Sequence, residues 1–98
     1  MPPSEYLANC RSEVLEIMSR YAPQGISNLR VIGSVARGTD GPDSDIDFLV
    51  DAGQISLMIL GGLQSELEEL LKVPVHILVS DSIKAELRDR IFAEAVEI

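Results

Sequence analysis

The segment GSVARGTDGPDSDIDFLV, residues Gly33–Val50, joins two apolar runs of this chain and decides how it folds. Its second half opens a strand-like run with Asp45-Ile46-Asp47. Aspartate is a poor strand former, and burying it without a partner costs several kcal/mol. A strand that begins in this way needs a compensating group close to both carboxylates, and a metal ion would meet that need.

The runs on either side of this segment are predicted to be neighbouring strands. Residues 26–32 form an apolar run that ends at Gly33, whereas residues 45–50 alternate apolar side chains with the two aspartates. The alternation directs Asp45 and Asp47 to one face of the second strand and the apolar side chains to the other. A helix of about one or two turns, starting at Ser34, and a short loop separate the strands, so we expect antiparallel pairing.

The rest of the chain alternates helices with a third strand. Apolar spacing predicts one helix over 4–21, capped by Ser4, and another over 56–72, capped by Ser56. Residues 73–79 predict the third strand, and a closing helix over 81–98 is expected to turn four apolar side chains inward, namely Ile83, Leu87, Ile91 and Phe92. The expected fold class is α/β (α+β): a small mixed three-stranded sheet with helices mainly on one face, in a single domain over 1–98.

The composition is acidic, and it is rich in apolar residues for so short a chain. Asp and Glu total 16 against 8 Lys and Arg, which gives a formal charge of -8. Such a field repels a phosphate backbone, so no direct binding of nucleic acid is expected and a basic protein partner is favoured. Because 46% of the residues are hydrophobic, part of the apolar surface is expected to face that partner.

Other features predict a cytoplasmic protein. Cys10 is the one cysteine, so no intrachain disulfide can form. The amino terminus has neither a basic nor an apolar leader segment, and no apolar run approaches the roughly 20 residues that span a membrane. We therefore expect no membrane association.

The two halves of the opening segment together predict a nucleotide site. Gly33 lets the backbone approach a ligand closely, and the amides that open the next helix, with the Ser34 hydroxyl, can donate to phosphate oxygens. Asp45 and Asp47 share one side of their strand with Cα atoms about 6.6 Å apart, so their carboxylates can hold one hard cation or bracket two. Mg²⁺ is the expected ion because it prefers oxygen ligands and substrate phosphates.

Each half alone has a plainer interpretation. Gly33-Ser34 could be a turn that ends a strand, and the two aspartates could lie on a solvated strand edge. Arg37 could steady a phosphate or form a surface ion pair with Asp43. The joint occurrence at this spacing favours the metal and nucleotide site.

The opening segment resembles the signature of the polymerase beta-like nucleotidyltransferase superfamily. The matching residues are Gly33-Ser34, then ten intervening residues, then Asp45-Ile46-Asp47. The fuller string and the ending LRDRIFAEAVEI resemble its smallest branch, the minimal nucleotidyltransferase (MNT) antitoxins, and the resemblance extends over residues 4–98. It implies transfer of AMP from ATP, with Gly33 and Ser34 on the triphosphate and the two aspartates on Mg²⁺. The implied acceptor is a tyrosine of a HEPN-type toxin, a small helical ribonuclease that adenylylation inactivates.

His76 departs from the family pattern. The run VHILV has His76 where the family has a third carboxylate, and the alternation of this strand directs it to the aspartate side. His76 could be a general base, because imidazole titrates close to neutral pH, or a metal ligand, although imidazole suits softer ions. It could also be an exposed histidine on a degraded site.

Three functions remain open at this point. The first is an antitoxin that neutralises its toxin by Mg²⁺-dependent nucleotidyl transfer, with Asp45, Asp47 and His76 as catalytic residues. The second is an antitoxin that acts by binding alone. The third is transfer to a small molecule, which usually needs a second domain to hold the acceptor.

Overall fold

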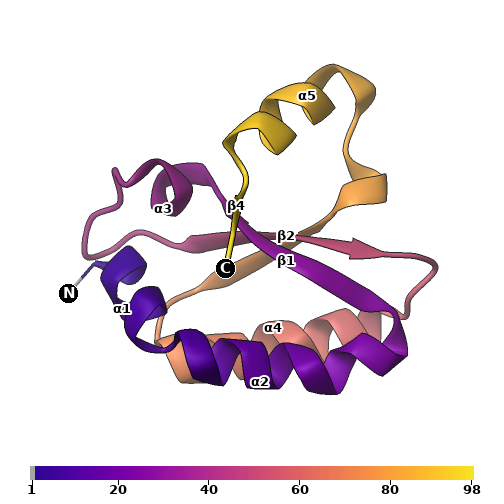
Figure 1. Cartoon of the computed structure of the whole chain (residues 1–98), viewed down its shortest axis with the longest axis horizontal. Coiled ribbons are helices and arrows are strands. Elements are labelled where there is room, and N and C mark those ends of the chain that lie inside the picture. Colours follow the sequence, from indigo (N-terminus) through magenta and orange to yellow (C-terminus); the bar gives the residue numbers. More distant parts are fainter. Residues whose placement is uncertain (1) are drawn as a thin grey trace.

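The computed structural model describes residues 2–98 and shows one mixed sheet between two layers of helices (Figure 1). The strand order is β3-β2-β1-β4, with bounds β1 Ile26–Ile32, β2 Ile46–Ala52, β3 Val75–Val79 and β4 Val96–Glu97. Strand β1 pairs antiparallel with β2 and β4, whereas β2 and β3 are parallel. The predicted fold class and the pairing of the first three strands are confirmed.

The fourth strand corrects the prediction of three. Helix α5, Ala85–Glu94, stops at Ala95, whose backbone is extended with φ -66° and ψ 135°. The chain then pairs Val96 with Val31 along β1. Without this pairing the outer edge of β1 would present unpaired backbone groups, so sheet pairing overrides the helical pattern of the last residues.

The layer below the sheet in Figure 1 contains the core. Helices α2, Arg11–Tyr21, and α4, Leu57–Leu71, cover this face. The predicted inward side chains of β2 are fully buried: Ile46, Phe48 and Val50 are each 0% exposed. The Ser56 cap is confirmed, because its Oγ accepts a hydrogen bond from the Met58 amide at 3.0 Å.

The predicted helix over 4–21 is broken in two. Helix α1, Pro3–Asn9, ends at Cys10, whose φ of -101° and ψ of 14° leave the helical range before α2 begins. The Ser4 cap is wrong. Pro2 holds the cap position, and the Ser4 amide instead donates to Asp40 Oδ2 at 2.8 Å. This bond ties α1 to the loop that follows α3, Gly33–Arg37.

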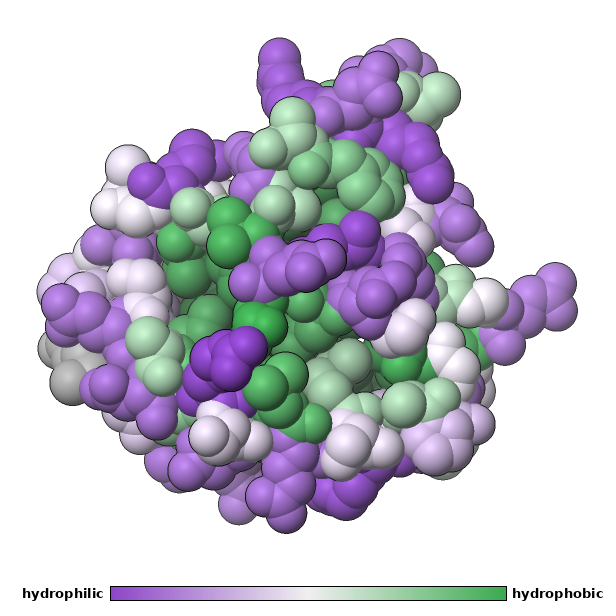
Figure 2. Space-filling view, viewed as in Figure 1, coloured by the Kyte–Doolittle hydropathy of each residue, from purple (hydrophilic) through white to green (hydrophobic). Residues whose placement is uncertain are grey.

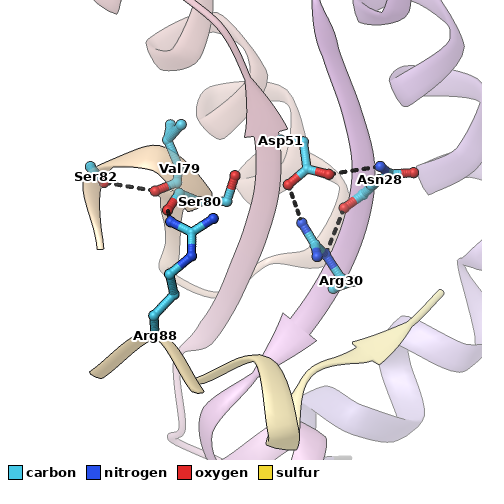
Figure 3. Close-up of polar contacts among 7 residues, drawn as sticks. All are labelled: Asn28, Arg30, Asp51, Val79, Ser80, Ser82 and Arg88. Carbon is cyan, nitrogen blue, oxygen red and sulfur yellow. Dashed lines mark hydrogen bonds and ion pairs between the residues drawn. The ribbon is translucent and has the colours of Figure 1, made fainter. Parts of the chain in front are cut away.

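Helix α5 lies over the opposite face of the sheet (Figure 1). The prediction that four apolar side chains turn inward is only partly correct. Leu87 is 43% exposed and α5 has no fully buried residue, whereas Phe92 is partly buried and its ring lies 5.1 Å from the Arg30 guanidinium of β1. The face beneath it is mixed: Leu49 of β2 is fully buried there, beside Asp51, which accepts hydrogen bonds from Arg30 and Asn28 (Figure 3). The helix therefore covers a face that has both apolar and polar side chains, while none of its own residues is fully buried.

Short 3-10 turns complete the fold at Ala22–Gln24 and Ser80–Ser82. None of the helices found in residues 2–98 could span a lipid bilayer.

Candidate nucleotide and metal site

Gly33 is the point at which the two halves of the opening segment meet. Its φ of +75° lies in the left-handed region that favours glycine, and a Cβ there would lie 2.8 Å from Asp47 Oδ2. The register explains this proximity, because Ile32 at the end of β1 pairs with Asp47 near the start of β2. The backbone turn and the aspartate are therefore in contact, and only glycine permits it.

The two aspartates differ in their surroundings. Asp45 immediately precedes β2 with its side chain 46% exposed, whereas Asp47 lies within the strand and is half-buried. Burial is the main cause that raises the pKa of Asp47, and the negative charges of Asp45 and Glu94 raise it further, while His76 opposes them. A nearby cation would relieve this unfavourable environment.

His76 lies on the aspartate side of the sheet, as its strand alternation predicts. It is paired with Asp47 in the parallel register of β2 and β3, and its Nε2 lies 3.1 Å from Asp45 Oδ2. An ionised carboxylate can only accept, so Nε2–H is the donor when Asp45 is charged. A neutral His76 then has its lone pair on Nδ1, and the side chain is 61% exposed, so a second molecule can reach it.

Arg37 and Ser34 come from α3, directly after Gly33. Ser34 is partly buried near the start of that helix. Arg37 forms an ion pair with Glu94 at 3.1 Å, and not the pair with Asp43 that the sequence left open. Glu94 also accepts a hydrogen bond from the Gly33 amide at 3.0 Å.

Glu94 is the site residue that the sequence did not reveal. It lies 61 residues from Gly33 in the chain, on a helix whose approach depends on tertiary contacts. No local motif marks it. Its place follows from the strand after it, because Val96 of β4 pairs with Val31 of β1 and so brings the end of α5 close to Gly33.

The donor set suits a hard cation. Among residues 2–98, no three His, Cys, Asp or Glu side chains converge as a ready metal cluster, so Asp45 and Asp47 form a two-carboxylate set. Mg²⁺ commonly takes one or two carboxylates and completes its shell with water and substrate phosphates. The arrangement therefore fits a metal that arrives with a nucleotide.

The family of nucleotidyltransferase domains matches residues 11–98. The chain belongs to the nucleotidyltransferase family. The prediction of a nucleotidyltransferase is thereby confirmed. A candidate protein adenylyltransferase from Methanocaldococcus jannaschii is 43% identical over 75 residues, which cover 76% of this chain and 81% of the relative. The protein adenylyltransferase MntA of Thermococcus cleftensis is 35% identical over 75 residues, which cover 76% of each chain.

Solved structures agree with this assignment. A candidate minimal nucleotidyltransferase superposes on this nucleotidyltransferase with a TM-score of 0.80 at 34% identity, covering 94% of this chain and 95% of the other. A toxin–antitoxin complex with AMP-PNP contains a chain that matches with a TM-score of 0.74 at 20% identity. The match covers 88% of this chain and 69% of the other. At that identity the second likeness shows the fold alone.

Proposed function

We propose that this nucleotidyltransferase is an antitoxin that transfers AMP from ATP to a tyrosine of a HEPN-type toxin in a Mg²⁺-dependent reaction. The observation that carries the proposal is the contact between the Gly33 turn and Asp47, which joins a phosphate-binding turn to a pair of carboxylates. The relatives named as protein adenylyltransferases support a protein acceptor and an adenylyl group.

The site residues then divide the work. Asp45 and Asp47 hold Mg²⁺, and Gly33, Ser34 and Arg37 bind the triphosphate. Bound Mg²⁺ supplies charge neutralisation at the phosphates. The protein residues align the α-phosphate of ATP with the acceptor hydroxyl, and such positioning provides most of the catalysis in phosphoryl transfer. The tyrosine oxygen bonds to the α-phosphorus, the bond from that phosphorus to the oxygen that bridges to the β-phosphate breaks, and pyrophosphate leaves.

His76 is proposed as the general base. With Nε2–H donated to Asp45, its Nδ1 is free to take the proton of an incoming tyrosine hydroxyl. The Asp45 contact fixes the ring and its tautomer, as a carboxylate does for a catalytic histidine. The exposed position of the ring suits an acceptor that belongs to another protein.

An antitoxin that acts by binding alone is the second candidate. The contact between His76 and Asp45 favours it. His76 stands where the family has a third carboxylate, and it binds one of the two aspartates. The solved toxin–antitoxin complex with a similar fold supports a toxin partner for either candidate.

Calorimetry with ATP tests the metal and nucleotide site. We expect the native chain to bind ATP with Mg²⁺ and not with EDTA, because the paired carboxylates repel triphosphate until a cation lies between them. The double variant Asp45→Asn/Asp47→Asn should lose the dependence on Mg²⁺. Asp81→Asn is the control, since it removes an exposed carboxylate beyond the far end of β3. Equal ATP affinity in Mg²⁺ and in EDTA would remove the basis of the site.

A further inference from the structure

The Glu94 carboxylate occupies the donors that a phosphate group would use. Its Oε1 accepts from the Gly33 amide at 3.0 Å, and its Oε2 accepts from Arg37 Nη1 at 3.1 Å. Two oxygens of one anion thus bind a backbone amide and a guanidinium, which is the pairing that two non-bridging phosphate oxygens would make. The Gly33 amide has a single hydrogen, so a phosphate oxygen and Glu94 compete for it, and both compete for the charge of the Arg37 guanidinium.

Glu94 also adds negative charge to a site that already has two carboxylates. Its charge is one of the causes that raise the pKa of Asp47. Glu94 thus joins Asp45 and Asp47 near Gly33, and Arg37 is its cationic partner. An incoming triphosphate therefore meets repulsion from Glu94 in addition to competition for its donors.

The helix that holds Glu94 is weakly attached. None of the residues of α5 is fully buried. The ring of Phe92 lies 5.1 Å from the Arg30 guanidinium of β1 and 5.2 Å from the guanidinium of Arg88, which belongs to the same helix. Arg88 donates to the Ser80 carbonyl at 3.1 Å (Figure 3). A helix that buries none of its own residues opens at lower free energy than the core, so α5 and the short strand β4 that follows it can move while the pairing of β1, β2 and β3 is kept.

We propose that Glu94 is an internal competitor for the triphosphate, and that α5 must withdraw it from Gly33 and Arg37 before a nucleotide binds. This inference rests on the proposed nucleotide site. The chain is then in equilibrium between a closed state, with Glu94 on these donors, and an open state that accepts ATP. The apparent affinity for ATP is lowered by the fraction of open chains.

Calorimetry on Glu94 variants measures this competition. We expect Glu94→Ala to bind Mg²⁺-ATP about tenfold more tightly than the native chain, because the closed state is lost. Glu94→Gln keeps the shape of the side chain and should gain less, since its amide oxygen can still accept from Gly33. Glu86→Gln is the matched control: it removes the same charge from an exposed residue of the same helix, and its affinity should stay within about twofold.

Two further ligands separate competition from a general effect of charge. In Glu94→Ala, the affinity for tripolyphosphate with Mg²⁺ should rise by about the same factor as the affinity for ATP. The affinity for adenosine, which has no phosphate, should not change. The amide signal of Gly33 is followed by NMR. Without nucleotide, it should differ from the native chain in Glu94→Ala and not in Glu86→Gln. On addition of Mg²⁺-ATP, it should shift in the native chain and in Glu86→Gln alike.

The outcomes distinguish this inference from the proposed function. Equal ATP affinity for the native chain and both Glu94 variants, with an unchanged Gly33 signal in the variants, would overturn the competition and leave nucleotidyl transfer intact. An equal gain in Glu86→Gln and Glu94→Ala would also overturn it, because the gain would then reflect net charge. Failure of every variant to bind ATP at millimolar concentration would overturn the proposed function and the inference together.

Discussion

At the scale of single residues, Gly33 has two separate reasons to be glycine. One is its φ of +75°, and the other is the 2.8 Å approach of a Cβ to Asp47 Oδ2. Gly38 shares the first reason, with φ +72°, and has nothing within 4 Å of its Cβ position. The comparison of these two glycines isolates the contact with Asp47.

We expect Gly33→Ala and Gly38→Ala each to destabilise the fold by about 1 kcal/mol from the left-handed backbone. Only Gly33→Ala should displace the Asp47 carboxylate and abolish Mg²⁺-dependent ATP binding. Thermal unfolding measures the first effect and calorimetry the second. Loss of ATP binding in both variants would mean that backbone strain, and not the contact, controls the site.

Substitutions of His76 should change the rate of AMP transfer in opposite directions under the two candidate functions. If it is the general base, His76→Ala should lower the rate of AMP transfer about 10²–10⁴-fold while ATP affinity changes little. If the site is degraded, the native chain should be inactive and His76→Asp should restore transfer through a third carboxylate. The mass of the partner after incubation with each chain, increased or not by one AMP, separates the two.

At the scale of helices and strands, α2 and α4 meet through a polar contact at their edge. Tyr21 donates a short hydrogen bond of 2.5 Å to Glu66, and this bond chiefly raises the pKa of Tyr21 and lowers that of Glu66. The contact needs Gly62, because a Cβ there would lie 2.9 Å from the Tyr21 hydroxyl. Gly61, by contrast, has nothing within 4 Å of its Cβ position.

These neighbouring glycines should respond in opposite ways. Gly61→Ala is expected to stabilise the chain by about 1 kcal/mol, the difference in helix propensity between glycine and alanine. Gly62→Ala should be about 1–2 kcal/mol less stable than Gly61→Ala, because it displaces the Tyr21 hydroxyl from Glu66. Denaturant unfolding measures both. In a Tyr21→Phe background the two substitutions should become equivalent, and a difference that persists there would exclude the hydroxyl as the cause.

The sequence predicted the elements that depend on local patterns. The bounds of β1, the alternation in β2 and the Ser56 cap all follow from spacing within a few residues. Strand β4 and the place of Glu94 do not, because they depend on which sheet edge and which backbone donors the end of the chain meets. The break at Cys10 also escaped the pattern, since the apolar spacing continues across it.

At the scale of the whole molecule, apolar surface and negative charge point to a protein partner. Figure 2 shows apolar surface in the middle of one face, interrupted by hydrophilic residues. Two cavities, of about 230 and 380 Å³, flank the C-terminal residues Glu97 and Ile98, and both are lined largely by apolar side chains. Leu57 and Met58 are 84% and 86% exposed at the start of α4.

We expect binding of the proposed toxin partner and chemistry on it to be separable. A candidate partner is a basic helical protein of the HEPN type, sought in the neighbouring reading frame. Asp45→Asn/Asp47→Asn should still co-purify with it, because shape and apolar burial hold such an interface, whereas AMP transfer should be lost. With a net charge of -8 on this chain, the association rate should fall as salt rises while the dissociation rate changes little. A double variant that folds, by circular dichroism, yet fails to co-purify would show that the two aspartates belong to the interface as well as to the site.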